Sequence, residues 1–425
     1  MFKLKEHGTT KLIEFNAGLT IFFSMVYVLA ANPAILAASG MPREALFTAT
    51  ALGALTATLL MALIANLPFA VAPGMGLNAF FVVVATALGY TWSQALTAVL
   101  VSGLIFFALS LSPLREKVLS EVPKPLQYAV CAGVGLMIAS IGLTNTGVVS
   151  FTSGSPALGD ISKGAPLLVI IGIFVTASLL AFKFRFAILA GIVITTLIGI
   201  PLGVTDTGIL SGGILSLPPS LAPIAFKFDF SVLSSFDFWG VVIAFLFIEI
   251  VDGLAGFLGL FSIMGKDAER YRPKLGRAFI ADSLGVVTGS MMGLSPNTTY
   301  GESGAGVAAG GRTGFTALVT AACFAVAIFA APLFLMVPFA AIAPALIVVG
   351  WLMITPLTRI DFQDATEAFP AILAVALIGL TWRISDSLAL AWLTYLVMKV
   401  LSGRRRELTG TVWTVGLIFM VKLVA

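Results

Sequence analysis

Long apolar stretches alternate with short polar connections along nearly the whole chain. Most stretches run for about 17 to 25 residues, the length that an α-helix needs to cross the hydrocarbon core of a bilayer. The piece 411–425 is short and carries Lys422, so we expect a C-terminal interfacial or partial helix there. The pattern predicts fourteen membrane spans, at residues 14–35, 45–68, 71–90, 92–112, 126–146, 165–182, 186–204, 238–264, 277–294, 297–310, 314–336, 338–355, 368–382 and 385–401.

The composition agrees with an all-α polytopic membrane protein. Hydrophobic residues make up 59% and charged residues 10% of the 425 residues, whereas a soluble domain carries roughly 25% charged residues. Cys131 and Cys323 both lie in apolar stretches, so no disulfide framework is expected. His7 is the single histidine, which argues against a histidine-based metal site or a Ser-His-Asp triad. We therefore expect no metal, no cofactor and no enzymatic activity.

Lysine and arginine residues are unevenly distributed between the predicted connections. With the N-terminus in the cytoplasm, nineteen of the 24 fall on the cytoplasmic side, Lys422 is unassigned, and Arg43, Lys163, Lys227 and Arg383 fall outside. Cytoplasmic connections normally carry the excess of positive charge. The distribution therefore predicts a multi-pass protein of the plasma (cell inner) membrane, with an even number of spans and both termini in the cytoplasm. The basic excess reflects topology, and we expect no nucleic-acid partner.

Two predicted spans are interrupted. The third contains "APGMGLNAFF" at 72–81 and the tenth contains "SPNTTYGESGAGVAAGG" at 295–311. Proline removes a backbone donor and glycine loosens a helix, and unwound backbone at membrane depth is tolerated only where protein buries it or where it lines a cavity. Pro73 and Pro296 are 223 positions apart, and the first and eighth spans are offset by about the same number. We infer two copies of seven spans, the second inverted, with a transport site between the breaks.

Four acidic residues lie inside predicted spans, and no lysine or arginine lies deep in one. They are Glu249 and Asp252 in "FIEIVDGLAGFLGL", Asp282 in "ADSLG", and Glu302. A charge at mid-bilayer costs at least ~2.5 kcal/mol on insertion scales, so such acids usually face a cavity or a proton relay. We predict that all four take part in proton coupling and that Asp252 and Glu302 also bind a ligand. Two alternatives stay open: Glu249 could cap or pair locally, and Asp282 could anchor the backbone beside the tenth span.

Polar and aromatic residues beside the two breaks indicate what a ligand would meet. Asn78 can both donate and accept hydrogen bonds, and Thr298 and Thr299 add hydroxyl groups. Phe80 and Tyr300 could offer an aromatic face, although the chain has 33 phenylalanines and Phe80 could equally serve packing. The site has acceptors for N–H groups and no fixed cation. It therefore favours a small, neutral, polar heterocycle.

Several long motifs resemble the nucleobase–cation symporters of the xanthine/uracil permease family, and most closely its adenine/guanine/hypoxanthine branch. The resemblance runs nearly from end to end. The motifs are "FNAGLTIFFSMVYVLAANPAIL" (15–36), "APGMGLNAFF" (72–81), "ADSLG" (281–285), "TTYGESGAGVAAGGRTG" (298–314) and "TPLTRIDFQDATEAFPAIL" (355–373).

The resemblance implies a fold of fourteen spans in two inverted repeats of seven. Spans 1–4 (residues 1–125) and 8–11 (238–336) would form a core domain, and spans 5–7 (126–237) and 12–14 (337–425) a gate domain. Spans 3 and 10 would contain short antiparallel strands, with the substrate between them and span 8. Members of the family commonly form homodimers through gate-domain contacts.

The resemblance also implies roles for individual residues. Glu302 matches the base-binding carboxylate of span 10, Asp252 the acid of span 8, Asp282 the acid of span 9, and Asn78 the amide of span 3. Glu249 stands where this branch usually has a second acid, an aspartate.

The chain departs from this branch of the family at three glycines. Gly253 and Gly256 replace threonines of span 8, and Gly301 replaces a bulkier apolar residue. These three positions lie at the predicted site. They leave the exact substrate open, but they do not affect the predicted fold.

We therefore expect a secondary active transporter that imports a purine nucleobase (adenine, guanine or hypoxanthine) by proton symport through alternating access. Sodium coupling and a xanthine/uracil-type substrate are open alternatives. An inorganic-anion transporter or channel on the same architecture would require a cationic group that the site does not offer. An integral-membrane enzyme would require a nucleophile–base or metal constellation, which a single histidine disfavours.

Overall fold

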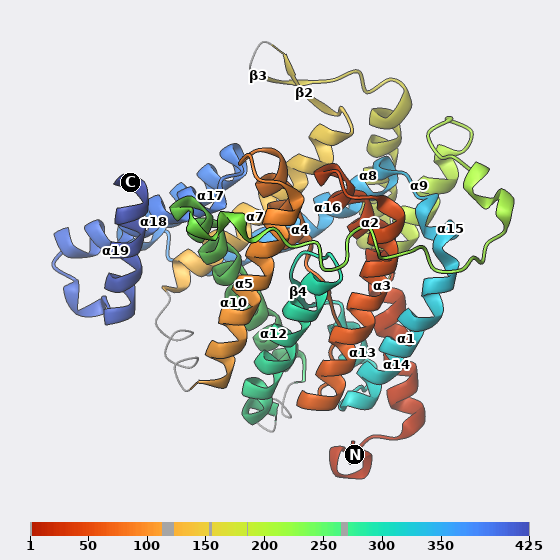
Figure 1. The fold of residues 1–425 in the computed structure, drawn as a ribbon, viewed down its shortest axis with the longest axis horizontal. Helices are drawn as coiled ribbons and strands as arrows, with labels where there is room; N and C mark the ends of the chain where they lie inside the picture. Colours follow the sequence, from red (N-terminus) through yellow and green to blue (C-terminus); the bar gives the residue numbers. More distant parts are fainter. Residues whose placement is uncertain (1, 113–122, 153–154, 185, 265–270, 425) are drawn as a thin grey trace.

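The computed structural model describes residues 2–112, 123–152, 155–184, 186–264 and 271–424, which form a bundle of helices (Figure 1). The N-terminus lies at the lower end of this view, below α1 and α14, and the C-terminus lies at the left beside α18.

Most of the described helices, and strands β1 and β4, lie over the predicted spans, with ends that differ by a few residues. In the first half the described elements are α1 (Lys11–Met25), α2 (Val28–Leu36), α3 (Arg43–Leu60), a π-helical turn (Met61–Ala65), β1 (Val71–Pro73), α4 (Met75–Thr86), α5 (Trp92–Leu111), α7 (Lys124–Asn145), β2 (Val149–Thr152), β3 (Ser155–Leu158), α8 (Gly164–Ala181) and α9 (Ala187–Gly199).

The second half repeats the order of the first: a long helix, a second helix, a strand followed by a short helix, and then further helices. Its elements are α10 (Phe236–Ile263), α12 (Leu275–Met291), β4 (Asn297–Thr299), α13 (Ser303–Ala308), α14 (Gly314–Ala327), α15 (Ala331–Leu335), α16 (Phe339–Ile354), α17 (Ala365–Thr381), α18 (Ile384–Leu401) and α19 (Gly410–Val424).

Among the described residues, nine helical stretches are long and apolar enough to cross a membrane, and three shorter apolar helices accompany them at Met75–Thr86, Ala187–Gly199 and Ala365–Thr381. The protein is therefore an integral membrane protein, as predicted. The number of fourteen crossings stays a prediction.

Helices from the two halves pack into two groups. One group joins α1 to α14, α3 to α12 and α14, and α5 to α10 and α12. The other joins α7 to α16 and α17, α8 to α9 and α16, and α17 to α18. The α7–α16 contact is close because Gly135 faces Gly350: a Cβ added to Gly135 would lie 2.5 Å from the Gly350 carbonyl oxygen. Small residues allow such approaches between membrane helices.

A buried carboxylate joins α1 to the start of α14. Glu14 accepts hydrogen bonds from the backbone N–H groups of Arg312 (3.0 Å), Thr313 (3.3 Å) and Thr316 (3.2 Å), and from the Thr313 and Thr316 hydroxyls. The first N–H groups of a helix have no partner within the helix, so Glu14 supplies acceptors that α14 lacks. This buried acid was not among the four predicted in the spans.

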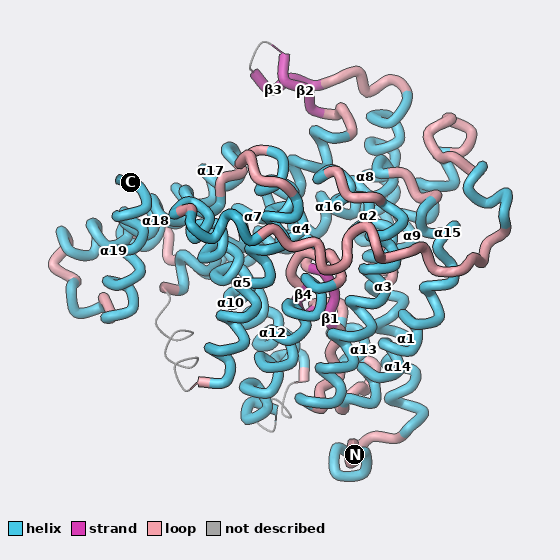
Figure 2. Tube along the Cα trace, viewed as in Figure 1, coloured by secondary structure: helices cyan, strands magenta, loops and turns pink. Residues whose placement is uncertain are grey.

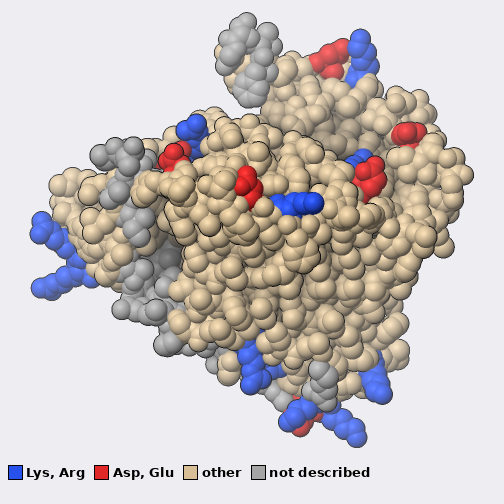
Figure 3. Space-filling view, viewed as in Figure 1, with Lys and Arg blue, Asp and Glu red and all other residues tan. Residues whose placement is uncertain are grey.

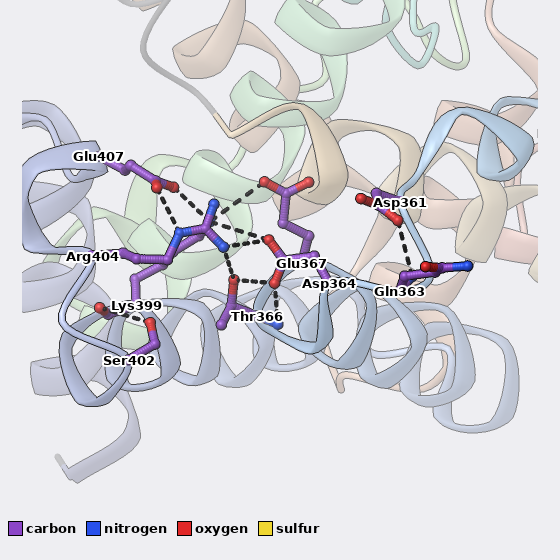
Figure 4. Close-up of polar contacts among 9 residues, drawn as sticks. All are labelled: Asp361, Gln363, Asp364, Thr366, Glu367, Lys399, Ser402, Arg404 and Glu407. Atoms are coloured by element: carbon purple, nitrogen blue, oxygen red, sulfur yellow. Dashed lines mark hydrogen bonds and ion pairs between the residues drawn. The ribbon is translucent and has the colours of Figure 1, made fainter.

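Ion pairs gather where α17 begins and α18 ends (Figure 4). The buried Lys399 amino group lies 2.7 Å from Glu407 Oε2 and 3.4 Å from Glu367 Oε1. Arg404 pairs with Asp364 and, at 2.6 Å, with Glu407 Oε1. The Thr366 hydroxyl and the Arg404 guanidinium lower the pKa of Asp364 to about 2.

The C-terminal segment is a helix that packs along α18. The Trp392 indole donates to the Val412 carbonyl at 3.0 Å, and its ring lies 5.9 Å from that of Phe419. The sequence predicted an interfacial or partial helix here. These contacts show that the helix, α19, packs against α18.

A β-hairpin in the connection 147–164 was not predicted. Strands β2 and β3 pair antiparallel and project from the upper end of the bundle (Figure 2). On the face shown in Figure 3, charged side chains run in a row across the upper half and also lie at the lower and left margins, and a broad area without them lies below that row. Such an area suits contact with a bilayer.

Candidate functional site

The two broken helices meet in a two-stranded antiparallel sheet. Strand β1 pairs with β4 in the register Val71↔Thr299, Ala72↔Thr298 and Pro73↔Asn297. Beyond the paired residues, Gly74 N–H donates to the Pro296 carbonyl and Tyr300 N–H donates to the Ala70 carbonyl, both at 3.0 Å. Helices α4 and α13 begin just after the strands. The predicted strands in spans 3 and 10 are thus confirmed.

Neighbouring elements hold this sheet in place. The Thr58 hydroxyl of α3 bonds to both the N–H and the carbonyl of Val71, each at 3.0 Å. The Asn297 amide donates to the Gly285 carbonyl of α12 at 2.8 Å, and Ala70 N–H donates to the Ser303 hydroxyl at 3.0 Å. The sheet therefore has partners for its backbone on several sides, as buried peptide groups require.

Glu302 directly precedes α13, next to the sheet. Its Oε1 accepts a hydrogen bond of 2.7 Å from the Tyr27 hydroxyl, which comes from the junction between α1 and α2. The residue before it, Gly301, is exposed, and a Cβ added there would meet nothing within 4 Å. Open space therefore lies beside the Cα of Gly301, where the bulkier family residue would stand.

The second acid, Asp252, is partly buried on α10 and lies beside Thr298 of β4. The Thr298 hydroxyl is buried but makes no hydrogen bond within the described part of the chain. An unsatisfied buried hydroxyl costs free energy unless something else pairs with it. The Asp252 carboxylate lies beside this hydroxyl, so the two groups form one polar patch between α10 and β4.

The other two acids are held by hydroxyl groups. The Thr299 hydroxyl donates to Asp282 Oδ1 at 3.1 Å, so Asp282 anchors strand β4 to α12. The Ser102 hydroxyl of α5 donates to Glu249 Oε1 at 2.8 Å, while Glu249 Oε2 is buried and has no hydrogen-bond partner among the described residues. Asp282 thus has the anchoring contact that was one of its two predicted roles, and Glu249 has one local partner with one oxygen left over.

The remaining predicted site residues differ in their surroundings. Asn78 is fully buried, and its side-chain oxygen accepts a hydrogen bond from the Ser295 hydroxyl. The Tyr300 hydroxyl donates to the Pro73 carbonyl at 2.6 Å. Phe80 is fully buried and its ring centroid lies 4.6 Å from that of Phe245 on α10. In this conformation Phe80 packs within the protein, which is the alternative left open for it.

Two glycines of α10 allow this helix to approach the site. A Cβ at Gly253 would lie 3.0 Å from Asp282 Oδ2, and one at Gly256 would lie 3.3 Å from the Thr299 carbonyl oxygen. Both distances are tighter than ordinary van der Waals contact. Gly253 and Gly256, which differ from the family pattern, therefore lie next to the hydrogen bond between Thr299 and Asp282.

Sequence reasoning missed Tyr27, Ser102, Ser295 and Ser303. Tyr27 lies within the first family motif, but nothing in its spacing indicated a contact with Glu302. Hydroxyl residues in membrane helices commonly bond across to other helices, which was the one available signal for the serines. Among the described residues, no group of three or more His, Cys, Asp or Glu side chains could hold a metal ion.

Curated relatives match the chain over its whole length. It is 38% identical to the adenine permease AdeP of Escherichia coli (strain K12) over 427 residues, covering 100% of this chain and 95% of AdeP. It is also 38% identical to the guanine/hypoxanthine permease PbuO of Bacillus subtilis (strain 168) over 432 residues, covering 100% of this chain and 99% of PbuO.

Solved structures share the fold at low sequence identity. The transmembrane domain of the cyanobacterial bicarbonate transporter BicA aligns with a TM-score of 0.62 and 19% identity, covering 85% of this chain and 96% of that one. The murine anion transporter Slc26a9 in its inward-facing state aligns with a TM-score of 0.64 and 11% identity. The alignment covers 92% of this chain and 68% of Slc26a9. Residues 12–390 match the profile described as "Permease family", Xan_ur_permease. From this match and the full-length relatives together, the chain belongs to the xanthine/uracil permease family.

Proposed function

We propose that this protein is a secondary active transporter that imports a purine nucleobase, namely adenine, guanine or hypoxanthine, together with a proton. The names of the full-length relatives, an adenine permease and a guanine/hypoxanthine permease, support the substrate class.

The observation that carries the proposal is the group of side chains at the β1–β4 sheet. Glu302 lies on one side, directly after the exposed Gly301, and Asp252 lies beside the hydroxyl of Thr298, which has no hydrogen bond by geometry among the described residues. Carboxylates accept hydrogen bonds from N–H groups, and a hydroxyl both donates and accepts. A purine presents N–H donors and ring-nitrogen or carbonyl acceptors along its edges, so this set of groups complements it.

The acids also support coupling to protons. Glu249 and Asp282 are buried near the site, each with a hydroxyl donor and without a basic partner among the described residues. Acids inside membrane helices typically form proton relays. We propose that Asp252 and Glu302 bind base and proton, and that Glu249 and Asp282 assist proton movement. Sodium coupling is tested by the same assay.

We propose that transport follows from movement of a core (1–125 and 238–336) against a gate (126–237 and 337–425). The helix contacts support this division, because α4 and α10 meet α7, α1 meets α9, and α2 meets α16 where the two groups adjoin. The site on α10 and β4 lies on the core side of that boundary. Movement of one unit past the other would expose the site alternately to each side. A homodimer with both termini in the cytoplasm is part of the same proposal.

Transport of an inorganic anion is disfavoured. The solved neighbours include a bicarbonate transporter and an anion transporter, but at 11% to 19% identity they show the fold alone. Acidic side chains with no arginine or lysine among the described contacts of the site would repel an anion.

The experiment that tests the proposal is uptake of radiolabelled bases in cells that lack their own purine transporters. We expect saturable uptake of at least one of adenine, guanine and hypoxanthine, competition by the unlabelled base, and loss of uptake with a protonophore. Uptake that continues with the protonophore but requires sodium would overturn proton coupling and leave the purine substrate unchanged. Absence of purine uptake by the expressed protein would overturn the substrate.

A further inference from the structure

Tyr27 joins the first span to the candidate site. It lies at the junction between α1 and α2, its side chain is 2% exposed, and its hydroxyl donates to Glu302 Oε1 at 2.7 Å. The two residues are 275 positions apart. Nothing in the roles inferred above for the four acids makes use of this tyrosine.

The ring and the hydroxyl of Tyr27 meet different surroundings. The ring lines an apolar cavity of about 800 Å³ between α1, α9, α14 and α15, together with side chains such as Phe22, Ile192 and Phe334. Glu302 does not line this cavity. Tyr27 thus contacts a mainly apolar space, while its hydroxyl bonds to the carboxylate of Glu302.

A hydrogen bond to one oxygen restricts the whole carboxylate. A glutamate side chain has several rotamers, and ordering such a side chain costs conformational entropy when a ligand binds. Because Tyr27 holds Oε1, this cost is met before the ligand arrives. The second oxygen is then the one that receives an N–H group.

We propose that Tyr27 is a positioning residue for substrate: it holds Glu302 so that Oε2 faces the bound base, and thereby sets the affinity of the site for N–H donors. This inference rests on the proposed function. It means that the first span, which lies outside the β1–β4 sheet and α10, influences substrate affinity.

The test compares Tyr27→Phe with wild type in purine uptake and in equilibrium binding of the same labelled base by purified protein. The substitution keeps the ring in the apolar cavity and removes the hydroxyl. We expect the apparent KM and the Kd to rise about tenfold, within the range for losing a hydrogen bond to a charged group, while the maximal rate changes less than about twofold. Tyr128→Phe is the matched control, since the Tyr128 hydroxyl has no hydrogen bond among the described residues, and it should behave as wild type.

A double-mutant cycle tests whether Tyr27 acts through Glu302. Glu302→Asp retains a carboxylate but shortens it by one methylene, which withdraws it from Tyr27, so its KM should also rise. If Tyr27 acts through Glu302, adding Tyr27→Phe to Glu302→Asp should raise KM by less than about twofold further.

The outcomes separate the two proposals. An unchanged KM in well-folded Tyr27→Phe, or full additivity in the double variant, would overturn the positioning role while leaving purine transport intact. Wild-type protein that neither binds nor takes up any purine would overturn the proposed function itself.

Discussion

The Tyr300 hydroxyl donates a hydrogen bond of 2.6 Å to the carbonyl oxygen of Pro73, and so connects the two broken helices next to the sheet that they form. Tyr300 follows β4 and Pro73 ends β1, 227 positions earlier. The bond joins the two halves of the chain at the site.

Removal of this hydroxyl should weaken the junction. Tyr300→Phe leaves the Pro73 carbonyl without that donor, and an unsatisfied buried acceptor costs about 1–3 kcal/mol. We expect a lower unfolding temperature in detergent and reduced purine uptake. Tyr128→Phe, at a residue outside the sheet, serves as the control. Equal stability of Tyr300→Phe and wild type would show that the contact does not hold the junction.

A side chain at position Gly253 should reduce transport. In Gly253→Ala the new Cβ would lie 3.0 Å from Asp282 Oδ2, so the Thr299–Asp282 hydrogen bond must shift. We expect uptake to fall by about tenfold, a change of about 1.4 kcal/mol. Gly259→Ala on the same helix is the matched control, because a Cβ there meets nothing within 4 Å. If both variants transport like wild type, the close approach of α10 is not needed.

Glu14 should contribute more to stability than an exposed acid. The two Glu14 oxygens together accept from five donors of residues 312–316, and Glu14→Gln removes the charge and replaces one of these oxygens with an NH₂ group. Lost hydrogen bonds to a charged group of this kind cost about 2–3 kcal/mol. Thermal unfolding of the purified variant should therefore begin at a clearly lower temperature. Glu6→Gln, at an exposed pair with Lys3, should change stability little, and a loss of equal size there would contradict the assignment.

Asp364 should make the stability of the α17–α18 end depend on acid pH. Its pKa of about 2 in the folded protein lies below the ordinary value, which is about 3.9. The ionised group therefore stabilises the fold above about pH 4, and this contribution is lost as the pH falls from about 4 to about 2. Asp364→Asn should flatten that part of the pH–stability profile measured by thermal unfolding. Asp361→Asn, at a carboxylate with no ion pair among the described residues, should leave the profile unchanged.

The main features of the site could be predicted because they depend on local chemistry. Pro73 and Pro296 each stand beside glycine or polar residues, and their common offset indicated that the breaks would meet. Proline alone is not the signal, because Pro33, Pro344 and Pro370 lie inside helices. Asp252, Asp282, Glu249 and Glu302 were conspicuous as acids in apolar stretches. These signals lie in short windows of sequence, so no knowledge of helix packing was needed.

The contacts between distant helices could not be predicted in the same way. The Tyr27–Glu302 and Glu14–Thr316 contacts depend on how α1 is rotated against α13 and α14, and apolar stretches carry little periodicity that would fix this rotation. The β2–β3 hairpin was missed because its residues are polar and glycine-rich, as connections are. The burial of Lys399 depends on acids brought together from α17 and the segment after α18.

The central claim is that Glu302 receives a purine base that enters with a proton. Its most direct test is uptake of labelled adenine, guanine or hypoxanthine into proteoliposomes containing wild-type protein or Glu302→Gln, with and without an inward proton gradient. We predict gradient-driven uptake by wild type and loss of that uptake in Glu302→Gln, although the variant elutes as folded protein in size-exclusion chromatography. Proton-driven purine uptake by Glu302→Gln at the wild-type rate would contradict the account.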